Sequence, residues 1–127
     1  MKIEIKDGLP YVSTKLIHHG KTITLENVVI DTGSATTLFR MDDLLQLGIV
    51  FASDDVVEQV RGVGGAETVV AKRIEKIEVG NLHIAHFSVD IGAMNYGFVI
   101  DGLLGFDFLR QTGALIDLTA MEIRAAG

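Results

Sequence analysis

The stretch Val28-Val29-Ile30-Asp31-Thr32-Gly33-Ser34 decides how the rest of the sequence is interpreted. Three β-branched apolar residues in a row are typical of a strand that is buried on both faces. The run stops at Asp31, and Gly33 permits a tight turn because it has no Cβ to clash with the backbone. The hydroxyl groups of Thr32 and Ser34 can donate hydrogen bonds within this turn. We therefore expect Asp31 to be a rigidly held carboxylate, placed for acid–base chemistry at the end of a buried strand.

Strand signals dominate the remainder of the chain. Segments that alternate polar and apolar residues, or are rich in β-branched side chains, occur at residues 2–6, 10–17, 22–31, 36–39, 56–61, 66–79, 82–91, 98–100, 114–118 and 121–124. Helix signals are confined to residues 41–47, which Gly48 ends, and to residues 106–110. Together with 14 glycines, this pattern predicts an all-β fold. We expect a closed or folded β-barrel with one or two short helices, rather than alternating strands and helices.

Composition narrows the classes of function. The 127 residues fit a single domain, residues 1–127, and 48% of them are hydrophobic, which is sufficient for a core. The formal net charge is −6 and the basic residues are scattered, so we expect no nucleic-acid partner. The absence of cysteine excludes disulfides, thiolate metal sites and a cysteine nucleophile. The apolar runs are too short to span a membrane, and the alternating N-terminus lacks the core of a signal peptide, so we expect a cytoplasmic protein with no membrane partner.

A second motif lies about 70 residues after Asp31. It reads Gly102-Leu103-Leu104-Gly105 and leads into Phe106-Asp107-Phe108-Leu109-Arg110, with Ile116-Asp117-Leu118 further on. In this order, and with a glycine-rich turn between the two motifs, the chain resembles the retropepsin-like aspartic proteases over residues 10–125. These include the retroviral proteases, their single-domain bacterial relatives and the protease-like domain of the DNA-damage-inducible ubiquitin-shuttle proteins. The last group is the most similar in layout.

The resemblance implies a role for each matching residue. Asp31 is similar to the catalytic aspartate, and Thr32 to the residue that braces the two active-site loops across a dimer axis, while Gly33 and Ser34 complete the loop. The residues Leu103, Leu104 and Gly105 resemble the element that supports the loop. The family's flap, which closes over a substrate, is matched in this chain by Gly62, Val63, Gly64 and Gly65. Ser34 replaces the alanine more usual in retroviral enzymes, as it does in pepsins, and the flap lacks the tyrosine of pepsins.

The implied activity is that of an aspartic endopeptidase. Its mechanism needs two carboxyl groups that share one proton, so that the charged one activates a water and the neutral one donates to the carbonyl oxygen. Because the chain has one Asp-Thr-Gly, the resemblance implies a homodimer with a peptide or protein substrate and with no metal or cofactor. Within one chain the rival second acid is Asp101, which we interpret as a turn residue.

Two other classes of function fit the same fold. One is a peptide-binding module that keeps the cleft but cleaves little or nothing. The other is a dimerisation domain in which Asp31 and Thr32 only stabilise the interface. The four histidines suggest no metal site, because the adjacent side chains of His18 and His19 are expected to diverge and because His83 and His86 point to opposite faces of a strand. Residues 94–96 are interpreted as a loop, with the lining of a pocket as the alternative.

Overall fold

The structure is a computed structural model that describes residues 1–62 and 65–127. Within this part of the chain, ten strands and two short helices follow the order β1 Glu4–Lys6, β2 Leu9–His18, β3 Lys21–Ile30, β4 Leu38–Arg40, α1 Met41–Leu45, β5 Val57–Gly62, β6 Gly65–Val79, β7 Leu82–Gly92, β8 Gly102–Leu104, α2 Phe106–Gln111, β9 Ala114–Asp117 and β10 Glu122–Ala125. Neither helix is long and apolar enough to cross a membrane. The predicted all-β fold with short helices is confirmed.

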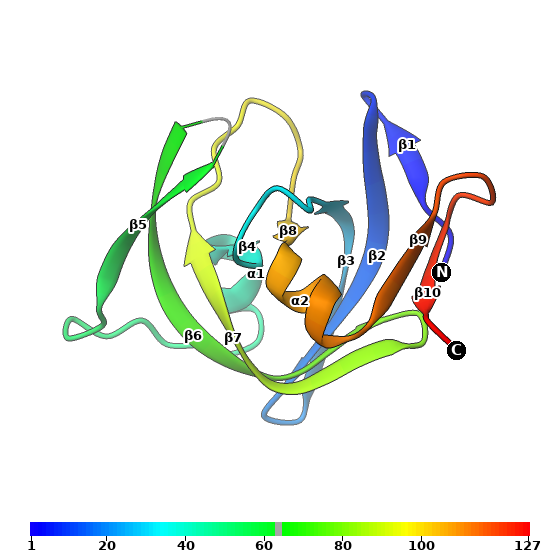
Figure 1. Ribbon diagram of the computed structural model, residues 1–127. Helices are drawn as coiled ribbons and strands as arrows, with labels where there is room; N and C mark the ends of the chain where they lie inside the picture. Colours follow the sequence, from blue (N-terminus) through cyan, green and yellow to red (C-terminus); the bar gives the residue numbers. More distant parts are fainter. Residues whose placement is uncertain (63–64) are drawn as a thin grey trace.

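One sheet contains β1 to β8 in the order β1-β2-β3-β8-β4-β7-β6-β5, and an additional pairing joins β2 to β6. This last pairing closes the sheet on itself, which gives the strongly curved sheet in Figure 1. Strand β8 runs parallel to β3, and β4 runs parallel to β7. Strands β9 and β10 form a separate hairpin, which contacts the N-terminal segment through a bridge between Lys2 and Glu122. The expected closed or folded barrel is therefore what forms.

Apolar side chains fill the barrel in two clusters. The larger cluster includes Leu16, Phe39 and Ile77, which are fully buried, and it also holds Phe108 of α2. The rings of Phe87 and Phe108 meet edge to face with centroids 6.3 Å apart, so helix α2 is anchored against β7. The smaller cluster lies under the second part of β3 and contains Val29 and Leu38. The strand that leads to Asp31 is thus fixed by packing on both faces, with Val28 and Ile30 in the larger cluster and Val29 in the smaller.

The structure corrects three expected boundaries. Residues 98–100 form no strand, because Phe98 and Val99 are exposed in a loop and β8 begins only at Gly102. The helix expected over residues 41–47 ends at Leu45 and is followed by a turn, in which Gly48 adopts a positive φ of 73°. The segment expected to extend from residue 36 enters β4 only at Leu38.

Candidate active site

Asp31 stands directly after β3, in the loop that leads to β4. Its backbone N–H donates to the carbonyl oxygen of Leu104 at 3.0 Å, so the pairing of β3 with β8 continues up to the aspartate. The loop then turns sharply, because the N–H of Ser34 donates to the carbonyl oxygen of Asp31 at 3.2 Å. In Figure 1 this loop is the cyan segment between β3 and β4. The backbone on both sides of Asp31 is therefore fixed by hydrogen bonds.

The carboxylate of Asp31 is held without being enclosed. Its Oδ1 accepts a hydrogen bond of 3.0 Å from the N–H of Gly33. A Cβ on Gly33 would lie 3.3 Å from the same oxygen, which is a tight contact, so glycine suits this position. Asp31 is half-buried, while Thr32 and Gly33 are exposed. The loop thus presents an oriented carboxylate on an open surface, where a water, a substrate or a second chain can reach it.

The second sequence motif supports this loop from behind. Leu104 is fully buried, and Leu103 packs against the smaller core cluster. A Cβ on Gly105 would overlap the carbonyl oxygen of Thr36 and would lie 2.9 Å from that of Ser34, so only glycine lets the two segments approach. The two motifs identified in the sequence therefore interlock in space.

A contact between Thr37 and Asp107, which was not predicted from the sequence, joins the two motifs. Thr37 is fully buried, and its Oγ1 donates to Oδ1 of Asp107 at 2.8 Å while it accepts from the N–H of Gly105 at 3.0 Å. Oδ1 of Asp107 also accepts from the N–H of Phe108 at 2.7 Å, within the first turn of α2. The only signal in the sequence was an acidic residue at the start of a helix. Its partner on the other motif depends on the tertiary fold.

Comparisons with known proteins agree with this geometry. Residues 15–108, well over half of the chain, match a family model described as aspartyl protease. The chain belongs to the aspartyl protease family. The fold is similar to that of a crystal structure of a retropepsin-like aspartic protease from Rickettsia conorii, with a TM-score of 0.67 and 17% sequence identity. That match covers 97% of this chain and 95% of the other, and at this identity it shows the fold alone. A comparison with curated protein sequences finds no match.

The flap predicted from the family resemblance falls on the hairpin of β5 and β6. Gly62 and Gly65 are the last backbone pair of the hairpin, whereas Val63 and Gly64 lie outside the described residues. In Figure 1 the hairpin rises on the same side of the molecule as the Asp31 loop. The Oε1 of Glu67 on β6 accepts a hydrogen bond of 2.8 Å from the N–H of Met94, which ties the hairpin to the loop after β7.

That loop lines a hollow beside the hairpin. Residues 94–100 and Arg40 surround it, so the alternative interpretation of residues 94–96 as a pocket lining fits the structure. Burial raises the pKa of the Tyr96 hydroxyl, and the negative charges of Glu67 and Asp31 act in the same direction. The Tyr96 hydroxyl therefore lies close enough to Asp31, the predicted catalytic residue, to be affected by its charge.

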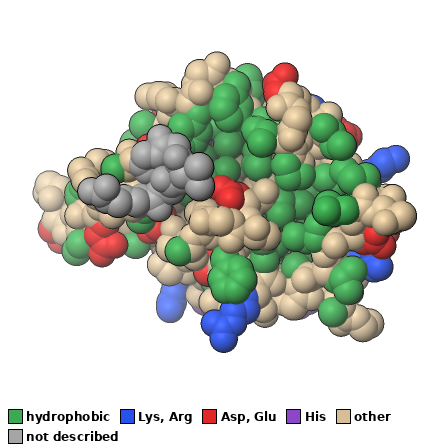
Figure 2. All heavy atoms as spheres, turned by 45° about the horizontal axis from the view of Figure 1, so that its top comes forward, with side chains coloured by type: hydrophobic (Ala, Val, Ile, Leu, Met, Phe, Trp, Pro, Cys, Tyr) green, Lys and Arg blue, Asp and Glu red, His purple; other side chains and the backbone are tan. Residues whose placement is uncertain are grey.

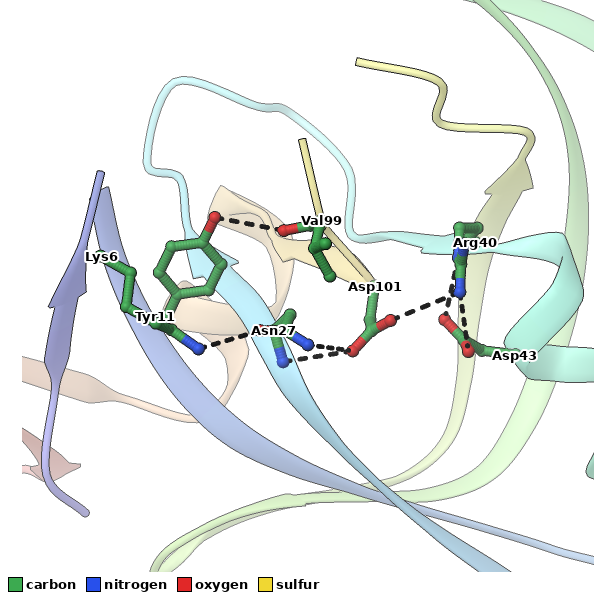
Figure 3. A network of polar contacts seen from close by, with 7 residues as sticks. All are labelled: Lys6, Tyr11, Asn27, Arg40, Asp43, Val99 and Asp101. Carbon is green, nitrogen blue, oxygen red and sulfur yellow. Dashed lines mark hydrogen bonds and ion pairs between the residues drawn. The ribbon is translucent and has the colours of Figure 1, made fainter. Parts of the chain in front are cut away.

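Asp101, the rival acid, belongs to a buried polar network (Figure 3). Its Oδ2 accepts from the backbone N–H and the side-chain amide of Asn27, at 3.2 and 3.3 Å, and its Oδ1 lies 3.7 Å from Nη2 of Arg40. Arg40 also binds both oxygens of Asp43, at 3.3 and 3.4 Å. Asp101 is therefore a cross-link between β3, β4 and the start of β8, rather than the turn residue that we expected.

Opposing influences act on the pKa of the neighbouring Asp43. Burial raises the pKa of its carboxyl group, and the nearby carboxyl of Asp101 raises it further, while the hydrogen bond from Arg40 acts in the opposite direction. The two acids and the single guanidinium are drawn together in Figure 3. Because β3 and β8 are paired from Val28 and Gly102 to Ile30 and Leu104, this network and Asp31 lie at opposite ends of the same pair of strands.

Proposed function

We propose that this chain is an aspartic endopeptidase whose active unit is a homodimer. The observation that carries the proposal is the Asp31 carboxylate, which is oriented by Gly33 on an exposed loop of a retropepsin-like fold. The other acid considered for the pair, Asp101, is 8% exposed and is engaged by Asn27 and Arg40. A second copy of Asp31, supplied by a symmetric partner, is the simplest source of the second carboxyl group.

The surface around the candidate site supports association. Figure 2 shows that hydrophobic side chains gather over a wide part of the face that the top of Figure 1 presents. Large hydrophobic side chains are exposed in several parts of the chain, among them Ile5 of β1 at 66%, Phe106 of α2 at 52% and Leu118 after β9 at 71%. Patches of this kind are typical of surfaces that contact another protein. The loop between β3 and β4, which contains the exposed Thr32 and Gly33, lies toward the top of Figure 1, so a partner that covers this face would reach the loop.

In the proposed mechanism the two Asp31 carboxyl groups share one proton, because two charges that close cannot both form. The ionised carboxylate takes a proton from a water molecule, whose oxygen attacks the carbonyl carbon of the peptide bond. The protonated carboxyl donates its proton to the carbonyl oxygen, which gives a tetrahedral diol. Transfer of a proton to the amide nitrogen then breaks the carbon–nitrogen bond and releases an amine and an acid. The substrate would lie extended beneath the β5–β6 hairpin and pair through its backbone.

Peptide cleavage tests the chemistry. Purified protein would be incubated with a diverse peptide library from acidic to neutral pH, with a statin-type transition-state inhibitor as a further control. We expect cleavage that the inhibitor blocks and that Asp31→Asn slows at least about a hundredfold. Asp54→Asn, at an exposed aspartate outside the site, should cleave like the wild type. A folded dimer that binds peptides without cleaving them at any pH would instead indicate a peptide-binding module. The cytoplasmic location and the single domain expected from the sequence stay predictions.

A mixing experiment tests the homodimer. Wild-type chains would be combined with an equal amount of Asp31→Asn chains under conditions that allow subunits to exchange. If each active unit needs two Asp31 residues, roughly a quarter of the dimers stay active, whereas a chain that acts alone would keep roughly half of the activity per total protein. Sedimentation of both proteins would show whether the variant still assembles. A change of assembly in Asp31→Asn would indicate that the loop serves dimerisation only.

A further inference from the structure

The turn that joins β2 to β3 carries two adjacent histidines, His18 and His19. Ten residues of β3 separate this turn from Asp31, a distance of about 33 Å along an extended strand, and the two lie at opposite ends of the molecule in Figure 1. The imidazole rings stack with centroids 4.2 Å apart and planes inclined by 15°. The expectation that these side chains diverge is wrong, because His19 adopts a positive φ of 47° and the chain is no longer extended there.

A carboxylate from β6 completes the group. Strand β2 pairs antiparallel with β6 through Leu16 with Ile77 and Ile17 with Lys76, so the next residue, His18, lies beside Glu75. The backbone N–H of Glu75 donates to Nδ1 of His18 at 3.3 Å. The backbone N–H of His19 donates to both carboxylate oxygens of Glu75, at 3.1 and 3.2 Å. Backbone hydrogen bonds thus hold the three residues together before any ligand binds.

We propose that His18, His19 and Glu75 form a binding site for a divalent transition-metal ion, with Zn²⁺ as the first candidate. Each residue offers one ligand atom, and these atoms lie within 4.8 Å of one another. Two imidazole nitrogens and one carboxylate oxygen are donors that suit Zn²⁺, Cu²⁺ and Ni²⁺, whereas Ca²⁺ and Mg²⁺ prefer oxygen alone. Three protein ligands leave one tetrahedral position for water.

Small rotations bring the ligand atoms to bonding distance. Around a tetrahedral Zn²⁺ with bonds of 2.0–2.1 Å, neighbouring ligand atoms lie about 3.3 Å apart, so the atoms must close by about 1.5 Å at most. The side chain of His19 is 74% exposed and that of Glu75 is 38% exposed, so both have room to rotate. The stacked ring of His19 must turn, because the nitrogen lone pairs of two parallel rings do not converge. Binding through either ring nitrogen of His18 ends the 3.3 Å hydrogen bond, because a metal at Nδ1 takes the lone pair that accepts from Glu75 and a metal at Nε2 leaves Nδ1 protonated.

The bound ion would connect the β2–β3 turn to β6. Because such a site forms only in the folded chain, the ion would stabilise the fold as any ligand of the native state does. The site lies far from the proposed active site, so it is independent of the proposed peptidase activity. Its test is accordingly a binding measurement rather than an assay of cleavage.

The experiment uses full-length protein without an affinity tag, treated with a chelator and then dialysed. Titration with Zn²⁺ by calorimetry, and with Co²⁺ by visible absorption, should show saturable binding of one ion per chain. We expect His19→Gln and Glu75→Gln to weaken the affinity at least tenfold. The matched control His83→Gln changes an exposed histidine outside the cluster and should bind like the wild type. Asp31→Asn should also bind normally, which separates this site from the active-site carboxylates.

Thermal unfolding gives a second readout. Zn²⁺ should raise the Tm of the wild type and of His83→Gln, and it should leave the Tm of His19→Gln and Glu75→Gln unchanged. Both substituted residues are at least partly exposed, so these variants are expected to fold. The proposal is overturned if no saturable binding occurs up to millimolar metal. It is also overturned if His19→Gln and Glu75→Gln bind the ion as tightly as the wild type and the two control variants do.

Discussion

The paired strands β3 and β8 hold a carboxylate at each end, in contrasting surroundings. At one end Asp31 is half-buried, next to two exposed residues, and its Oδ1 accepts from the backbone of Gly33. At the other end Asp101 is 8% exposed, and its oxygens face two donors of Asn27 and the guanidinium of Arg40. The same residue type is accessible for chemistry at one end and serves as a cross-link at the other. The difference lies in solvent access and in the number of committed donors.

The largest effect, on the rate of peptide cleavage, should follow from removing the charge at the accessible end of the strand pair. Asp31→Asn keeps the size and the hydrogen-bond acceptor of the side chain but cannot ionise. We expect the rate of peptide cleavage to fall by about 10²–10⁴-fold, the range that general acid–base catalysis contributes. The free energy of unfolding should change little, because the side chain is half-buried and its oxygen still accepts from Gly33. Cleavage rates and urea unfolding of the same preparation measure both quantities. Retained cleavage in this variant would contradict the assignment of Asp31.

Removing the carboxylate at the buried end should instead lower the free energy of unfolding. Asp101→Ala leaves both donors of Asn27 without their acceptor and removes a charge partner of Arg40. We expect the free energy of unfolding to fall by about 2–4 kcal/mol, less than for a fully buried ion pair because Arg40 is partly exposed. Urea unfolding measures the loss, and Asp54→Ala provides an exposed aspartate as control. A variant of wild-type stability that lacks activity would mean that Asp101 takes part in the chemistry.

A third substitution sharpens the comparison at the junction between the two motifs. Thr37→Val removes the hydroxyl that donates to Asp107 and accepts from the N–H of Gly105. We expect a loss of about 1–3 kcal/mol in the free energy of unfolding, the cost of unsatisfied buried polar groups. Activity should also fall, because Gly105 positions the loop that carries Asp31.

Thr14→Val is the matched control for this substitution. Thr14 is equally buried, but its hydroxyl donates only a long hydrogen bond of 3.5 Å to Val12 on the same strand. It should lose less stability than Thr37→Val and keep full activity. Equal effects of the two substitutions on activity would show that the Thr37 hydroxyl has no special role at the site.

Much of this architecture was predictable because it depends on local pattern. The apolar run before Asp31 indicated a buried strand, and Gly33 indicated the tight turn that follows it. The order of the two motifs led to the correct family. Short-range features of this kind carry their own signal in the sequence.

Contacts across the barrel were not predictable in the same way. Asp101 meets Asn27 because β8 inserts parallel to β3, and His18 meets Glu75 because β2 pairs with β6 to close the barrel. Both pairings join segments more than 50 residues apart in the chain. The strand expected at residues 98–100 was wrong for a related reason. Their composition fits a strand, but no strand within residues 1–62 and 65–127 pairs with them, and they line a hollow instead.

The smallest predicted effect concerns pH and distinguishes the Asp43 network from the partly exposed ion pair of Asp55 and Lys72. Because burial raises the pKa of Asp43, the folded state holds this proton more tightly than the unfolded chain does. The contribution of Asp43 is therefore complete below the unfolded pKa of about 3.9 and is lost as the pH rises through the higher folded value. The stability of the wild type relative to Asp43→Asn should fall over this window, as measured by urea unfolding at a series of pH values.

Asp55 should show the opposite slope. Its Oδ1 accepts a hydrogen bond of 2.9 Å from Nζ of Lys72, and this bond lowers the pKa of the Asp55 carboxyl, with the N–H of Ala52 adding to the effect. The folded state therefore releases the proton more readily than the unfolded chain. Its stabilising contribution is present above the unfolded pKa and is lost as the pH falls through the lower folded value. The stability of the wild type relative to Asp55→Asn should thus rise with pH in the acidic range. Slopes of the same sign for both variants would contradict the contrast, because two carboxylates with similar pKa shifts would share one kind of environment.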